Sequence, residues 1–254
     1  MPALELSLIA VVAAIFLFGG VVKGAMGFGL PLVTIAFLPF IMPVEAALAV
    51  NAVVLLIVNI LQFWQAGRAR EAFALAAPIL IGLALATPFG TMIATHVPRT
   101  LLLGLLGGFI IVFAALQLLG IPRMPEGAAA PKPGAARSFG VGVAGGLVGA
   151  FTSTPGPIFV MHFTAARLER PLFMATLGLL MGAVGAALAL SLAVAGVFDA
   201  ERSMLALAAL PTSFAGFWLG DRIGQRFSIE GFRKGVLILL CLLGAAMIQR
   251  ALTT

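Results

Sequence analysis

Charged side chains are scarce in this sequence, and their scarcity decides the class of protein. Of its 254 residues only 9% are charged and 62% are hydrophobic, and the mean hydropathy is +1.18. A chain with so little polar surface cannot coat a water-soluble globule. The sequence therefore predicts an all-α polytopic membrane protein that crosses the lipid bilayer several times, with the cell inner membrane as its expected location.

Cysteine and clustered basic residues are nearly absent too. Cys241 is the single cysteine, so neither a disulfide nor a cysteine-based zinc site is possible within one chain. The net charge of +6 comes from Lys and Arg that stand singly or in pairs between apolar segments. That pattern is typical of charges that orient a membrane protein and argues against nucleic-acid binding. We expect no cofactor and no metal, and the oligomeric state is left open.

Long apolar runs dominate what remains. A helix crosses a bilayer with about 20 residues, and six stretches are long enough, near residues 44–64, 73–95, 99–121, 172–197, 203–221 and 235–252. Two further apolar stretches, residues 7–41 and 138–163, are interrupted by KGAMGFGLP and GAFTSTPGP. Because glycine and proline clusters end helices, each of these two predicts a pair of short helices around irregular backbone.

A proline-rich segment, GIPRMPEGAAAPKPGAARS, lies between two halves of similar organisation. Its composition predicts a cytoplasmic linker at 122–137, between a first transmembrane repeat at 1–121 and a second at 138–254. Sliding the second half back by about 125 residues places one broken element on the other. Each repeat is therefore predicted to be a broken-helix hairpin followed by three transmembrane helices.

Basic residues predict how the repeats sit in the membrane. If each broken element is a hairpin that returns to the side it came from, eleven of the fifteen Lys and Arg residues share one side. Three residues, Arg99, Arg202 and Arg250, fall on the other side, and Lys23 is left inside the membrane. Single crossings would split the loop charges almost evenly. The positive-inside rule favours the hairpins, which makes the repeats inverted and puts both termini outside the cytoplasm.

This predicted architecture is typical of secondary transporters, whose sites lie where broken helices meet near the membrane centre. Irregular backbone persists at that depth only if it is buried in protein or lines a polar cavity. Glycines let backbone approach a ligand closely, and the N-termini of short helices attract negative charge. The breaks therefore predict a carrier that binds a small anionic solute.

The predicted binding site draws on both breaks and on the helices that follow them. Lys23 either lines the cavity, where burial of its charge costs about 2.5–3.5 kcal/mol, or snorkels to the cytoplasmic surface. Asn51 and Thr176, which the repeat superimposes, either reach the cavity or bond a neighbouring helix. The candidate substrate-binding residues are Lys23, Gly24, Gly27, Gly29, Asn51, Thr152, Ser153, Thr154, Gly156 and Thr176.

Polar residues elsewhere are assigned to interfaces. Asn59, Gln62 and Gln65 run toward a predicted cytoplasmic helix end, so we expect them at the membrane surface. His96 and His162 are expected at interfaces as well. None of the acidic residues stands out as a buried proton carrier.

Two other function classes remain as alternatives. An intramembrane enzyme, a hydrolase with Ser153 as nucleophile and His162 as base, is disfavoured because the sequence has no GxSxG elbow. A cation carrier is disfavoured because neither break contains a carboxylate. A carrier of another small anion stays open.

Three segments carry a resemblance to a known family. FGGVVKGAMGFGLPLV, GVAGGLVGAFTSTPGPIFV and LGDRIGQRFSIEGFRKGVLIL resemble the paired glycine-rich motifs and the closing stretch of the sulfite exporter TauE/SafE family of membrane transporters. The resemblance implies transport of small sulfur oxyanions or organosulfonates, such as sulfite or sulfoacetate, in a direction it does not fix. STPG in the second motif and lysine at position 23 depart from the family's pattern.

Overall fold

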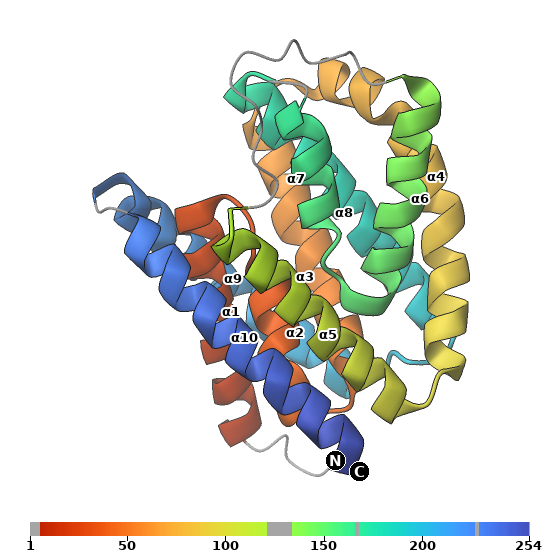
Figure 1. The fold of residues 1–254 in the computed structure, drawn as a ribbon, viewed down its shortest axis with the longest axis vertical. Coiled ribbons are helices and arrows are strands. Elements are labelled where there is room, and N and C mark those ends of the chain that lie inside the picture. The colour runs from red at the N-terminus through yellow and green to blue at the C-terminus, as the bar shows by residue number, and fades with distance from the viewer. Residues whose placement is uncertain (1–5, 121–133, 166–167, 227–228, 254) are drawn as a thin grey trace.

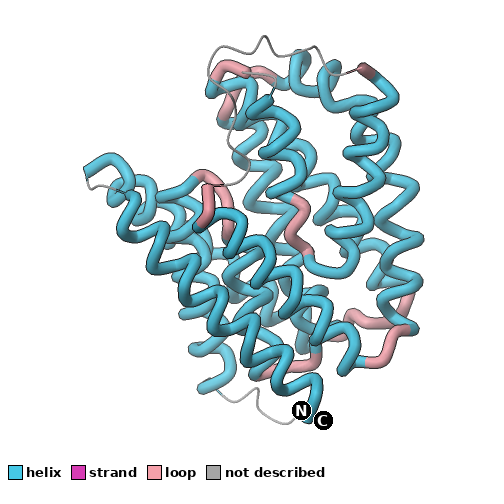
Figure 2. Tube along the Cα trace, in the orientation of Figure 1, coloured by secondary structure: helices cyan, strands magenta, loops and turns pink. Residues whose placement is uncertain are grey.

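The computed structural model describes residues 6–120, 134–165, 168–226 and 229–253, and nearly all of them are helical (Figure 2). The first half forms α1 (Leu6–Met26), α2 (Leu30–Phe37), the short 3-10 helix η1 (Leu38–Phe40), α3 (Val44–Gln65), α4 (Ala69–His96) and α5 (Arg99–Leu118). The second half forms α6 (Ala135–Thr152), α7 (Gly156–Ala165), α8 (Arg170–Val194), α9 (Ala200–Arg226) and α10 (Ile229–Thr253).

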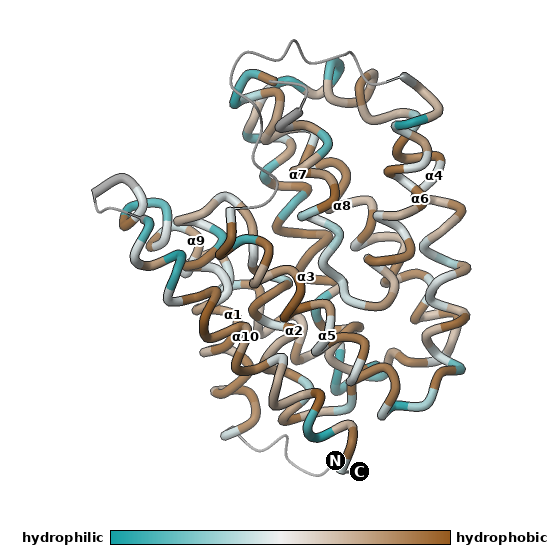
Figure 3. The backbone as a smooth tube through the Cα atoms, in the orientation of Figure 1, coloured by the Kyte–Doolittle hydropathy of each residue, from teal (hydrophilic) through white to brown (hydrophobic). Residues whose placement is uncertain are grey.

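Seven of the described helices are long and apolar enough to cross a membrane, so the chain is a multi-pass membrane protein. The six predicted spans are confirmed as α3, α4, α5, α8, α9 and α10. Figure 3 shows hydrophobic residues along the helices, with hydrophilic ones concentrated toward helix ends. Large apolar side chains such as Leu85, Val112 and Leu242 are exposed on these helices, as a lipid-facing surface requires. Residues 122–133 of the predicted linker lie outside the described residues. The rest of the predicted linker is largely helical, because α6 begins at Ala135.

The first broken element differs from the prediction of two short helices. α1 has 21 residues and is itself a seventh candidate span. Its glycines stay helical because they form the surface on which α9 packs. A Cβ atom added to Gly20 or Gly24 would lie 2.4 or 2.1 Å from a backbone carbonyl oxygen of α9. Gly216 and Gly220 of α9 meet the α1 backbone at 2.1 Å in the same way.

Helices of the two halves pack in pairs. α1 lies along α9, α4 along α6, α3 along α8 and α5 along α10. In chain order, α1, α3, α4 and α5 of the first half correspond to α6, α8, α9 and α10 of the second. If each helix is replaced by the one that corresponds to it, the same four pairs result. The first turn of α1 and the last turn of α10 lie toward the same end of the molecule (Figure 1). Each hairpin is thus held by a helix of the opposite half.

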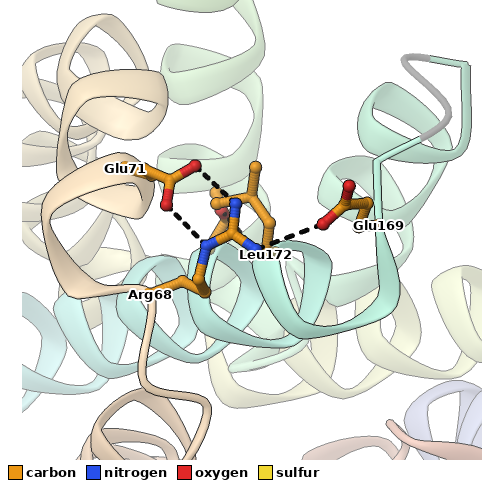
Figure 4. A network of polar contacts seen from close by, with 5 residues as sticks. Arg68, Glu71, Glu169 and Leu172 are labelled. Atoms are coloured by element: carbon orange, nitrogen blue, oxygen red, sulfur yellow. Dashed lines mark hydrogen bonds and ion pairs between the residues drawn. The ribbon is translucent and has the colours of Figure 1, made fainter.

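Arg68 joins the turn between α3 and α4 to the start of α8 (Figure 4). Its Nε donates to Glu71 Oε1 at 2.5 Å, and its Nη1 donates to Glu169 Oε2 at 3.1 Å. The hydrogen bonds that Arg68 donates, first to Glu71 and second to Glu169, raise the pKa of Arg68. Because the side chains are one-third or more exposed, the network adds little stability, but it aligns α4 with α8.

Candidate substrate site

Both broken elements turn at a residue with left-handed backbone. After α1, Gly27 has φ +82° and its N–H donates to the carbonyl of Lys23 at 2.7 Å. After α6, Ser153 has φ 54° and donates to the carbonyl of Gly149 at 2.8 Å. Glycine adopts this conformation freely, and Ser153 is the one non-glycine residue with positive φ in the described part of the chain. These equivalent caps are 126 positions apart, one more than the offset used to compare the sequences.

A short helix returns after each cap. Proline is the second residue of both α2 and α7. Its missing N–H costs no hydrogen bond there, because N–H groups in the first turn of a helix have no intrahelical acceptor. α2 folds back on α1, since a Cβ atom added to Gly19 would meet the Thr34 side chain at 3.1 Å. α7 folds back on α6, where a Cβ on Gly145 would meet the Phe159 ring at 2.4 Å. Both broken elements are therefore hairpins with the N-terminus of a short helix at the turn.

A small cavity of about 20 Å³, with room for about one water molecule, lies where the two hairpins meet. It brings together five of the predicted site residues: Lys23, Gly27, Gly29, Thr154 and Gly156. Further residues complete the wall, from the hairpins and from α3, α5 and α8: Phe28, Pro31, Leu32, Asn59, Phe113, Pro157, Leu177 and Met181. We call this space the central cavity.

Lys23 is the one charged side chain among these lining residues. It is only 4% exposed, and its Nζ donates to Asn59 Oδ1 at 2.8 Å. Asn59 in turn donates from Nδ2 to the carbonyl of Leu55 at 2.7 Å, which keeps its oxygen turned toward the ammonium. An ammonium has three donors, and this hydrogen bond uses one.

The hydroxyl groups of the second break bond largely to one another. Thr152 Oγ1 donates to the carbonyl of Val148 at 2.6 Å. It also accepts hydrogen bonds from the backbone N–H and the hydroxyl of Thr154, at 3.1 and 2.8 Å. Ser153 Oγ is buried and has no partner among the described residues, but it does not line the central cavity. Thr154 is therefore the one hydroxyl residue of this break on the cavity wall.

Three further predicted residues lie outside the cavity lining. Asn51 accepts a hydrogen bond from the Thr34 hydroxyl at 2.8 Å and donates to the Pro31 carbonyl at 3.4 Å, so it holds α2 against α3. Thr176 donates to the carbonyl of Leu172 in its own helix at 2.7 Å. Gly24 packs against α9.

Asn59 is the functional candidate that sequence reasoning missed. It and Gln62 were expected at the membrane surface, yet they are only 2% and 7% exposed. A buried lysine needs a hydrogen-bond acceptor, and the amide side chains on the next predicted span were the available candidates. His162, also expected at an interface, is 6% exposed, and its Nε2 lies 3.4 Å from Ser138 Oγ.

A wide vestibule of about 650 Å³ adjoins the central cavity and shares Gly27, Phe28 and Leu177 with it. Its wall also includes Arg170 at the start of α8 and Asp221 near the end of α9. Arg170 directly follows Glu169, which binds Arg68. The central cavity is therefore next to an opening at the Arg68 end of the molecule.

Seven apolar spans, with two helix breaks that meet at a lysine-lined cavity, define a polytopic membrane protein. Residues 12–247 match the protein family described as Sulfite exporter TauE/SafE. The match covers most of the chain, so the protein belongs to this family and the resemblance noted in its motifs is confirmed. Its family consists of transporters rather than enzymes. No curated protein and no solved structure matches the chain.

Proposed function

We propose that the protein is a facilitated carrier that moves sulfite or a small organosulfonate across the inner membrane and binds it in the central cavity. The observation that carries this proposal is the buried ammonium of Lys23, held by Asn59 with donors left over for a ligand. The cavity wall contains no carboxylate among the described residues. A positive charge on a cavity wall without a carboxylate favours an anion as the missing partner.

Backbone groups supply the other half of the proposed site. The first turns of α2 and α7 carry N–H groups without intrahelical acceptors, and both helices begin at the cavity. Gly27 leaves that backbone open, since no atom lies within 4 Å of where a Cβ on Gly27 would stand. Thr154 adds a hydroxyl once its hydrogen turns away from Thr152. Ser153 and Thr152 shape the turn behind it.

We also propose that the two halves are inverted repeats, as the charge distribution predicts. The self-consistent pairing of helices and the equivalent caps at Gly27 and Ser153 support this relation. An axis in the membrane plane would then place both breaks at the same depth, as transporters with inverted repeats do.

Export is the expected direction when no other force acts. A negative cell interior drives an anion outward with about 2.3 kcal/mol per charge per 100 mV. With no acidic side chain on the wall of the central cavity, tight proton coupling is not expected. Uptake follows the same route where metabolism keeps the internal concentration low.

The decisive experiment measures flux of radiolabelled sulfite and of methanesulfonate from proteoliposomes of purified protein. Asn59→Asp is the sharpest variant, because a carboxylate 2.8 Å from the ammonium would occupy Lys23 and repel the anion. We expect it to abolish flux. Gln117→Glu makes the same amide-to-carboxylate change on α5, where the new carboxylate meets Arg233 rather than Lys23, and should leave flux near the wild-type value.

Two outcomes would reject the proposal. Wild-type vesicles that retain both anions at the protein-free rate would remove the transport function. Full flux by Asn59→Asp would remove Lys23 from the site even if transport is real. Thr154→Val is expected to weaken binding by about tenfold, since a hydrogen bond to a charged ligand is worth about 1.5–3 kcal/mol. Ser153→Ala should have the smaller effect, because Ser153 is not on the wall.

A further inference from the structure

A second cavity, of about 390 Å³, lies at the other end of the molecule. It is bounded by the segment Pro39–Val44, by the start of α5 and by the end of α10. The 28 residues of α4 separate Arg68 from this end, a length of about 42 Å at 1.5 Å per residue. We call this space the outer cavity.

Two arginines from different helices line the outer cavity. Arg250, near the end of α10, donates from Nη1 to the carbonyl of Pro39 at 3.1 Å, and its guanidinium lies 6.0 Å from the centre of the Phe40 ring. Arg99, at the start of α5, donates from Nε to Glu45 Oε1 at 3.1 Å. The sequence assigned both arginines to the sparsely charged side of the membrane, where they are two of three basic residues. Two guanidinium groups at one cavity are therefore not an effect of general basic composition.

Glu45 competes only weakly for Arg99. The Arg99 side chain is 72% exposed, and exposed ion pairs gain little because solvent screens them. A guanidinium presents five N–H donors in a planar fork that matches the oxygen atoms of an oxyanion. The hydrogen bond of Arg99 to Glu45 uses one donor of that fork, and the guanidinium of Arg250 adds a second positive charge to the wall of the same cavity, so the pair suits a ligand with several acceptor oxygens.

The outer cavity lies in line with the central one. α2 begins at the central cavity, and its continuation η1 forms a wall of the outer cavity. α2 has eight residues, so the two spaces are about 12 Å apart along this helix. α5 also reaches both cavities, because Phe113 lines the central cavity and Leu103 lines the outer cavity. An anion leaving the central cavity away from the Arg68 end would follow these two helices to the arginines.

We propose that the outer cavity is a second oxyanion site on the transport path, where Arg99 and Arg250 hold a small sulfite- or sulfonate-class anion at the end opposite the linker. The place of this site on a path rests on the proposed function, whereas anion binding at the two arginines does not. A phospholipid phosphate offers the same chemistry at a membrane surface, and the experiment below separates it from a free anion.

Binding is measured first, by calorimetric titration of sulfite and methanesulfonate onto detergent-purified Lys23→Met protein, in which the central site is disabled. We expect one remaining site, weakened about tenfold by Arg99→Gln or by Arg250→Gln. Arg99→Lys and Arg250→Lys keep the charge but lose the planar fork, so their affinity should lie between those of the wild type and the glutamine variants. Arg202→Gln is the matched control, because Arg202 is the third basic residue of that side and does not line the cavity.

Glu45→Gln gives the sharpest sign test. Removing the carboxylate that engages Arg99 should strengthen anion binding about two- to fivefold, opposite to the effect of the arginine variants. A variant that only destabilised the fold would not bind the anion more tightly. A decrease in affinity in Glu45→Gln would contradict the proposal.

Exchange across vesicles then tests the path in protein with Lys23 intact. Arg99→Gln should raise the external sulfite concentration for half-maximal exchange about tenfold and leave the internal one unchanged. A loss that occurs only in vesicles with anionic lipid would identify a lipid phosphate site and overturn the proposal, as would wild-type affinity in both arginine variants. Wild-type vesicles without sulfite exchange would instead refute the proposed function, and the calorimetric result would still decide on the outer site.

Discussion

Replacement of Lys23 by methionine tests the central cavity most directly. The side chain is 4% exposed and gives one of its three donors to Asn59 at 2.8 Å, which leaves two donors for an anion. At the lower value of about 1.5 kcal/mol for each hydrogen bond to a charged ligand, the two contribute about 3 kcal/mol. That free energy corresponds to about a hundredfold in affinity for sulfite.

Calorimetric titration of sulfite onto purified wild-type and Lys23→Met protein measures this loss. Lys23→Met also leaves the buried Oδ1 of Asn59 without its donor, which costs about 1–3 kcal/mol of stability. The double variant Lys23→Met with Asn59→Leu removes that unpaired oxygen, and should recover stability without recovering affinity. Lys234→Met is the matched control, because Lys234 is an exposed lysine paired with Glu230 at 2.8 Å.

The result that would refute the reasoning is specific. Wild-type affinity in Lys23→Met, with a normally folded protein, would mean that the ammonium does not touch the ligand. If Thr154→Val also kept wild-type affinity, the site would not lie between the two breaks.

Three further predictions concern packing, topology and energy. Gly216→Ala should lower the unfolding temperature clearly in a fluorescence melt, because its Cβ would stand 2.1 Å from an α1 carbonyl, whereas Gly108→Ala has no atom within 4 Å and should be neutral or stabilising. In a Cys241→Ala background, an impermeant thiol reagent on intact cells should label Thr253→Cys and spare Lys132→Cys; the reverse pattern would invert the topology. Sulfite flux in liposomes should persist when the pH gradient is collapsed, and strict dependence on that gradient would contradict uncoupled transport.

The breaks themselves were readable from local sequence. KGAMGFGLP and GAFTSTPGP predicted irregular backbone within apolar segments, and the structure turns the chain at Gly27 and at Ser153. The length of α1 was not readable in this way. Gly20 and Gly24 look like helix breakers in isolation, but they stay helical because a close α9 backbone needs the absence of a Cβ there.

The sequence by itself determined the class of protein, six of the seven candidate membrane spans, the place of the two breaks and the family, because hydropathy, glycine and proline act locally along the chain. The tertiary structure alone decided which side chains meet. Lys23 finds Asn59 across 36 positions of sequence, while Asn51, Thr152 and Thr176 turn to other partners. A hydrogen bond between helices depends on their rotation and distance, and these are set by how all the helices pack together rather than by any one segment.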